Sequence, residues 1–271
     1  LCEVQSKSKV FALLGGGYGA KRLAQTLADF GLGRLKMAVG ERLSYGDEKI
    51  TFGTAAELAA REFDELSVAY IENPCPRRAL SVADGEFERN ETPMTKSEVR
   101  EIALSKLGIE PNSIVYDVGA GTGSVSVEAA LRAYNGKVYA VEFEKNAIEV
   151  LKKNKIKFKT SNLEIIEGAA PEALSALPPP THAFVGGSSG SMRGIIAAVL
   201  GKNPCARIAA TAVTLETTAE LAACAEEFGF NLSETVEVNI SKAKKLGSHR
   251  LMSAQNPVYI FVMQKSEGED K

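Results

Sequence analysis

"VYDVGAGTGSVSVEAA", residues 115–130, is the stretch of sequence that decides the fold. An apolar run delivers Asp117, glycines follow at Gly119, Gly121 and Gly123, and a helical pattern begins directly after them. Glycine lets the backbone approach a ligand closely, and the N-terminus of a helix favours an anionic group. The stretch is therefore typical of a strand, loop and helix that bind a ligand at the carboxyl end of a sheet.

The sequence on both sides of this stretch continues the alternation of strands and helices. Strands are expected at 113–118, 137–142, 162–166, 181–185 and 205–210. Helices are expected at 96–107, 124–134, 145–157, 171–176, 191–201 and 216–228. Two further strand-like runs, 232–240 and 257–264, are expected to form an antiparallel hairpin joined by a long basic connection, 241–256. The alternation predicts an α/β fold with a mainly parallel sheet and helices on both of its faces.

A downstream carboxylate gives the glycine loop a second feature. The next strand, KVYAVE, ends in Glu142, where a side chain can accept hydrogen bonds from both hydroxyls of a ribose. The glycine spacing is GxGxG, which differs from the GxGxxG of the dinucleotide fingerprint. A tight turn without a ligand and a nicotinamide site remain as alternatives to a different nucleoside cofactor.

The pattern D-x-G-x-G-x-G with a downstream Glu resembles the class I S-adenosylmethionine (SAM) methyltransferases, whose fold is Rossmann-like. In that family the glycine loop contacts the methionine part of SAM, and the acid holds the ribose. The segment IIEGAAPEAL, 165–174, is similar to the one that borders the adenine. The cofactor residues that the resemblance implies are Asp117, Gly119, Ala120, Gly121, Thr122, Gly123, Glu142, Gly168, Ala169 and Ala170.

Three further motifs resemble a narrower family, the decarboxylating precorrin C5,15-methyltransferases of cobalamin biosynthesis. They are ETPMTKSEVR (91–100), VGGSSGSMRGII (185–196) and GSHRLMSAQNPVYI (247–260). The resemblance implies methylation of C15 of a precorrin-6/8-type tetrapyrrole and loss of the carboxylate of its acetate side chain. It also implies that Thr95 touches SAM and that the protein is a homo-oligomer, expected to be a tetramer.

The substrate of such an enzyme carries many carboxylates, so its pocket requires cations. The candidates are Lys96, Arg100 and the basic residues of 241–256, among which Arg250 suits bidentate carboxylate binding. Next to it, His249 is the candidate proton donor, because an unperturbed His titrates near neutral pH. We therefore treat His249 and Arg250 as the candidate catalytic pair.

Small polar residues are expected at two other places around the same pocket. A Gly/Ser loop after the fourth strand offers N–H groups and hydroxyls to an anionic substrate, through Gly186, Gly187, Ser188 and Ser189. Thr95 is also a plausible N-cap, since Glu98 follows three positions later as in a capping box. The alternatives are a plain flexible connection for the loop and a purely structural cap for Thr95.

A competing glycine cluster, LLGGGYGAKRLAQTL (13–27), lies in the first part of the chain, but no acid precedes it. We expect strands at 10–14, 35–39 and 66–72 and helices at 20–30 and 54–62, with the cluster as a turn in an incomplete α/β domain. This part resembles the C-terminal half of the C5 methylase of the tetrapyrrole methylase family. The expected organisation is a partial methylase at 1–74, a linker at 75–90 and the methyltransferase at 91–265.

Composition limits the remaining classes of function. The net charge of −2 gives no general reason to expect nucleic acid binding, which disfavours a tRNA adenine or protein methyltransferase as the alternative enzyme. A non-catalytic SAM-binding module is the other alternative.

The four cysteines form no CxxC pair and there are two histidines, so no metal site is expected. Without a signal pattern or a membrane-length apolar run, we expect a cytoplasmic protein that does not bind membranes.

Overall fold

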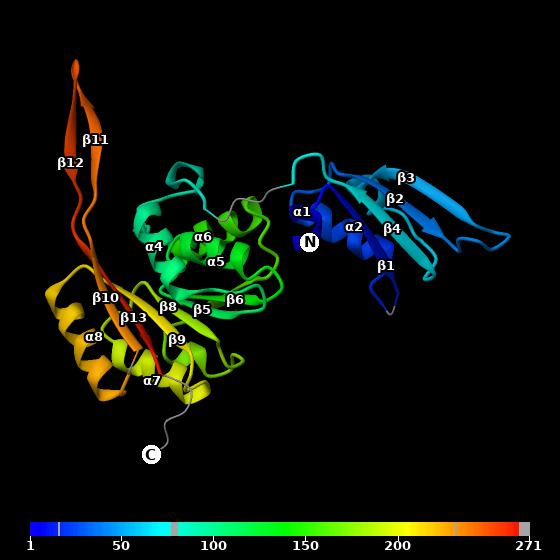
Figure 1. Ribbon diagram of the computed structural model, residues 1–271. Coiled ribbons are helices and arrows are strands. Elements are labelled where there is room, and N and C mark those ends of the chain that lie inside the picture. Colours follow the sequence, from blue (N-terminus) through cyan, green and yellow to red (C-terminus); the bar gives the residue numbers. More distant parts are fainter. Residues whose placement is uncertain (16, 77–80, 231, 266–271) are drawn as a thin grey trace. The chain divides into compact units, whose positions relative to one another are not determined.

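A computed structural model describes residues 1–15, 17–76, 81–230 and 232–265 of the chain (Figure 1). It contains two compact units, the first formed by Leu1–Ala79 with Lys155–Ser161 and the second by Leu80–Asn154 with Asn162–Lys271. Of the predicted linker at 75–90, residues 77–80 lie outside the described residues. Among the described residues, no helix combines the length and apolar character that a membrane crossing needs.

The first unit is built on a four-stranded antiparallel sheet in the order β1-β4-β2-β3. Its elements are α1 (Cys2–Ser6), β1 (Lys9–Leu14), α2 (Ala20–Asp29), β2 (Lys36–Glu41), β3 (Lys49–Thr54), α3 (Ala55–Leu58) and β4 (Ser67–Glu72). Buried side chains from the helices and the sheet, including Leu27 and Leu58, form one core. The glycine cluster is a turn in which Tyr18 N–H donates to Gly15 O over 3.2 Å, and Gly16 lies outside the described residues.

The sequence analysis missed helix α1 and strand β3 in this unit. Most residues of β3 were assigned to no element, and a helix was expected at 54–62, where the structure has the last residue of β3 followed by the short helix α3. β3 lies at the edge of the sheet and pairs with β2 alone. Its side chains Ile50 and Phe52 are exposed whereas Thr51 between them is buried, so the apolar residues do not mark the buried face of the strand.

The second unit contains a seven-stranded sheet in the order β10-β13-β9-β8-β5-β6-β7. Its strands are β5 (Ile114–Val118), β6 (Lys137–Glu142), β7 (Leu163–Glu167), β8 (His182–Val185), β9 (Arg207–Ala212), β10 (Leu232–Val238) and β13 (Val258–Gln264). The strands β5 to β9 are parallel, whereas β13 runs antiparallel between β9 and β10. The predicted mainly parallel sheet with a terminal antiparallel pair is confirmed.

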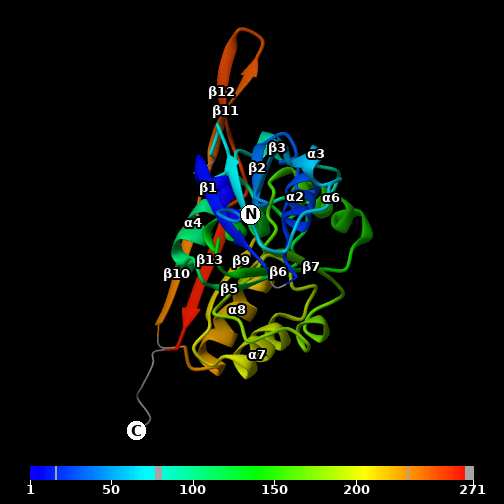
Figure 2. The same cartoon turned by 90° about the vertical axis from the view of Figure 1, so that its right-hand side faces the viewer.

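Helices cover both faces of this sheet, because most crossovers between its parallel strands carry a helix. They are α4 (Ser97–Leu107), α5 (Ser124–Arg132), α6 (Lys145–Lys157), α7 (Met192–Lys202) and α8 (Leu215–Glu227), with 3-10 turns η1 (Asp84–Glu86) and η2 (Glu172–Leu174). Both views place α7 and α8 on one face and α4 and α6 on the other (Figures 1 and 2). The strand order reverses at β5, which creates a crevice at the carboxyl ends of β5 and its neighbours.

The basic connection at 241–256 is a second correction, because it is a two-stranded ribbon and not a loop. β11 (Ser241–Leu246) pairs antiparallel with β12 (His249–Ala254), and Gly247 turns between them at a φ of 60°. Figure 1 shows this ribbon, in orange, projecting beyond the seven-stranded sheet from which it continues. Most side chains are exposed on both faces of the ribbon. Its strands therefore lack the alternation of apolar and polar residues that identifies a half-buried strand, and polar residues such as lysine occur on both faces.

Candidate functional site

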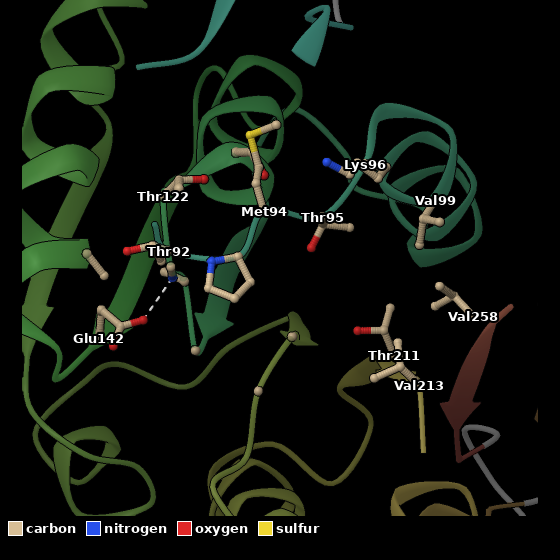
Figure 3. Close-up of a pocket in the computed structure, with 18 of the residues that line it drawn as sticks. Thr92, Met94, Thr95, Lys96, Val99, Thr122, Glu142, Thr211, Val213 and Val258 are labelled. Carbon is tan, nitrogen blue, oxygen red and sulfur yellow. Dashed lines mark hydrogen bonds between the residues drawn. The ribbon is translucent and has the colours of Figure 1, made fainter. Parts of the chain in front are cut away.

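A cavity of about 1140 Å³ opens at the carboxyl ends of the parallel strands of the second unit (Figure 3). Most of the residues predicted for the site line it. They are Thr95, Lys96, Gly119, Ala120, Gly121, Thr122, Glu142, Gly168, Ala169, Ala170, Gly186, Gly187, Ser188 and Ser189. The predicted residues that do not belong to the lining are Arg100, Asp117, Gly123, Lys245, His249 and Arg250. A small-molecule site typically measures about 300–1,000 Å³, so this cavity has room for more than one ligand.

The glycine loop turns sharply between β5 and α5. Gly119, Gly121 and Gly123 have φ values of 71°, 56° and 78°, a region that strains any residue with a Cβ. At Gly119 a Cβ would also lie 2.5 Å from the carbonyl oxygen of Gly187. The loops after β5 and β8 therefore meet backbone to backbone, and only glycine permits that approach.

The carboxylate of Glu142 lies at the wall of the cavity and is 6% exposed. Its Oε2 accepts a hydrogen bond from Gly121 N–H over 2.8 Å, as drawn in Figure 3. Its Oε1 accepts from the N–H groups of Phe143 and Glu144 over 2.8 and 2.9 Å. These bonds fix the carboxylate beside the glycine loop, and because each oxygen offers about two lone pairs, Oε2 keeps capacity for a ligand hydroxyl.

Asp117 lies beneath the loop, at 1% exposure, and not in the cavity wall. Ser126 Oγ donates to its Oδ2, whereas its Oδ1 has no hydrogen-bond partner among the residues that the structure describes. Burial and, to a lesser extent, the nearby Glu142 charge raise the pKa of Asp117 to about 7, although the Ser126 bond opposes this. In the structure Asp117 thus supports the loop from behind.

The predicted capping box at Thr95 is wrong. Helix α4 begins after Lys96, which is its N-cap residue and makes no side-chain capping bond. Glu98 instead pairs with Lys242 over 2.7 Å, and this hydrogen bond lowers the pKa of the Glu98 carboxyl. Because Thr95 caps no helix, its hydroxyl is left to point into the cavity (Figure 3).

Arg100 is not available as a substrate cation, which corrects the expectation from its position. Its side chain is fully buried, and its Nε donates to Glu128 over 2.7 Å. Its terminal nitrogens donate to the carbonyl oxygens of Thr95 over 2.7 Å and Val82 over 2.6 Å. Arg100 therefore holds the segment 82–95, whose last five residues line the cavity, against α4 and α5.

The far end of the cavity contains residues that sequence reasoning missed. Thr211, Val213 and Val258 form a wall across from Glu142, with Met94 and Val99 nearby (Figure 3). Val258 follows directly after the QNP of a motif quoted above, which was the available signal. Lys242 and Lys244 of the ribbon also belong to the lining. The lining thus contains both apolar and cationic side chains besides the glycine loop.

His249 and Arg250 lie in the ribbon strand β12, beyond the cavity lining, and both are exposed. The other histidine, His182, begins β8 at the opposite, amino end of the sheet, where burial lowers its pKa. Among the described residues no group of three or more His, Cys, Asp or Glu side chains is arranged to hold a metal ion. A catalytic role of His249 and Arg250 stays a prediction.

Comparison with known proteins places this site within a family. Residues 86–265, which include the whole cavity, match the precorrin methyltransferase domain. The chain belongs to this family. A probable cobalt-precorrin-6B C(15)-methyltransferase (decarboxylating) from Pyrobaculum calidifontis is 39% identical over 189 residues, which are 69% of this chain and 96% of the relative.

Solved structures agree with this assignment. Precorrin-6y C5,15-methyltransferase from Geobacter metallireducens has 36% identity and a TM-score of 0.65, over 68% of this chain and 97% of that one. A SAM-dependent O-methyltransferase from Thermotoga maritima has 15% identity and a TM-score of 0.58, over 90% and 98%. The latter likeness concerns the fold alone, and it confirms the class I SAM methyltransferase fold.

Proposed function

We propose that the chain is a SAM-dependent C-methyltransferase of cobalamin biosynthesis, which methylates C15 of a precorrin and decarboxylates its acetate side chain. The observation that carries the proposal is the carboxylate of Glu142, fixed beside the glycine loop in the cavity wall of a precorrin methyltransferase domain. The relative from Pyrobaculum calidifontis, whose name states this reaction, spans nearly its full length in the alignment.

The residues at one end of the cavity suit SAM, which supplies a methyl group on a sulfonium when bound. The glycine loop of 119–123 presents bare backbone, as the close approach of a ligand requires. Glu142 is placed for the ribose hydroxyls, and Gly168, Ala169 and Ala170 offer small side chains for the flat adenine. Thr95 points its hydroxyl toward the same space.

The part of the cavity that adjoins the SAM end is assigned to the tetrapyrrole. Gly186, Gly187, Ser188 and Ser189 bring N–H groups and hydroxyls close to the glycine loop, and Lys96 adds a positive charge. Transfer to carbon requires the nucleophilic carbon about 3–3.5 Å from the methyl group and in line with the sulfur. The work of these residues is therefore alignment, and we keep His249 as the proposed donor of the proton to the new methyl carbon after CO₂ is lost.

The first unit is proposed to derive from the tetrapyrrole methylase family, with residues 1–74 as its extent and 75–90 as the connection. The cavity described above contains no residue of that part. We further propose a homo-oligomer as the working form.

Incubation of the purified chain with SAM and cobalt-precorrin-6B tests the proposal. We expect S-adenosylhomocysteine to form together with a product that has gained one methyl group and lost CO₂, as mass spectrometry would show. Methyl gain without CO₂ loss would refute the decarboxylating part, and absence of S-adenosylhomocysteine in the presence of the substrate would refute the whole assignment.

A further inference from the structure

The ribbon of β11 and β12 has two chemically different faces. Directly paired residues of antiparallel strands lie on the same face, and successive residues alternate between faces. The register pairs Lys242 with Ser253, Lys244 with Leu251 and Leu246 with His249, and these six side chains therefore share one face. The opposite face carries Ala243, Lys245, Arg250 and Met252.

At the base of the ribbon, Ala254 of the opposite face also lines the cavity, but farther along β11 only the first face is directed to it. Lys242, Lys244 and Ser253 belong to the cavity lining, whereas Lys245 and Met252 do not. Lys242 is tied at the base of the ribbon to Glu98 on α4, over 2.7 Å. That ion pair is consistent with the inward direction of this face of β11.

Lys244 differs from Lys242 in having no ion-pair partner among the residues that the structure describes, and it is exposed. Its cross-strand neighbour Leu251 is 53% exposed, and Leu246 one row farther out is 65% exposed. Contact of exposed leucines with a flat apolar surface is favourable, because it removes apolar area from water. An ammonium group without an ion-pair partner can bind a carboxylate. Rows on one face of a strand lie about 7 Å apart, which suits one flat ring with charged groups at its edge.

We propose that the inward face of the ribbon is a subsite for the tetrapyrrole, in which Lys244 binds a peripheral carboxylate and Leu246 and Leu251 pack against the macrocycle. The inference rests on the proposed function for the class of substrate. It places His249 on the substrate side of the ribbon and Arg250 on the other side. The subsite extends the cavity outward from the Lys242–Glu98 ion pair, away from the SAM end.

The neighbours Lys244 and Lys245 provide a matched test, because they have equal charge, are both exposed and lie on opposite faces of the ribbon. We expect Lys244→Ala to raise the KM for cobalt-precorrin-6B about fivefold with little change in kcat, since it removes one partly solvated ion pair. We expect Lys245→Ala to have the same KM and kcat as the parent. Both variants should bind SAM with the affinity of the parent, as calorimetry would show. Equal KM values for the two variants would overturn the subsite.

A binding measurement keeps this test separate from the test of the reaction. Uroporphyrin, a polycarboxylate tetrapyrrole, is titrated into each protein, and its fluorescence is followed. We expect weaker binding to Lys244→Ala than to Lys245→Ala, and weaker binding to Leu251→Ala than to Met252→Ala. If the parent fails to turn over cobalt-precorrin-6B but these differences persist, the reaction is wrong and the subsite stands. Binding that is equal in all proteins, or absent from all, overturns the subsite.

Discussion

Arg100 donates from Nε to Glu128 over 2.7 Å, and both side chains are completely buried. Glu128 also accepts a hydrogen bond from Val82 N–H over 3.0 Å, so the pair joins the start of the segment 82–95 to α4 and α5. At the other end of this segment, Arg100 donates to Thr95 O. A buried ion pair thus positions the chain that covers one side of the cavity.

Removal of Arg100 is expected to destabilise the second unit strongly. Arg100→Ala leaves Glu128 as a buried charge without its partner, which typically costs about 3–5 kcal/mol. Arg193→Ala is the control, because it breaks an exposed ion pair with Glu227 whose contribution is below about 1 kcal/mol. Thermal unfolding followed by circular dichroism measures both. Similar losses in the two variants would contradict the role assigned to the buried pair.

Glu142 is expected to contribute directly to SAM affinity. Hydrogen bonds to a charged group are worth about 1.5–3 kcal/mol, so Glu142→Ala should weaken SAM binding about 10- to 100-fold in calorimetry. Glu149→Ala removes an exposed carboxylate of α6 outside the cavity lining and should leave the affinity unchanged. A parent-like Kd for Glu142→Ala would disprove the ribose contact.

Gly119→Ala is expected to abolish SAM binding and to lower stability. The substitution meets both a φ of 71° and the carbonyl oxygen of Gly187, so the two loops must separate. A strained backbone residue costs about 1–3 kcal/mol before any displacement. Gly201→Ala in α7 is the control, since its Cβ would enter open space. If Gly119→Ala binds SAM as the parent does, the close approach of the loops is unimportant.

The sequence predicted those parts of the site that depend on local pattern. The spacing of Gly119, Gly121 and Gly123 and the position of Glu142 at the end of a strand were enough to locate the cavity wall. The contact between Gly119 and Gly187 was not predictable, because it depends on β5 and β8 being neighbours in the sheet although far apart in the chain.

Charged residues were the least predictable part of the site. Arg100 was expected to face a ligand, but it is buried against Glu128, which lies on another helix. The ribbon lysines were expected in a loop, and only the strand register separates Lys244 from Lys245. A charged residue in the sequence does not reveal its partner. The burial of Arg100 and the ribbon face on which each lysine lies therefore had to come from the structure.

Because of Asp117, we expect the stability of the protein to fall as the pH rises. Its carboxyl has a pKa of about 7 in the folded protein against the ordinary value of 3.8, so between these pH values the folded state holds a proton that the unfolded state has lost. The free energy of unfolding should therefore decline between about pH 4 and pH 7 and level off above, because the native state binds more protons in that range. Asp117→Asn, which cannot ionise, should lack this decline, as melts across that range would show. Ser126→Ala removes a hydrogen bond that lowers this pKa, so the decline should start at the same pH and continue to higher pH. A difference between parent and Asp117→Asn that stays constant with pH would show that Asp117 does not titrate there.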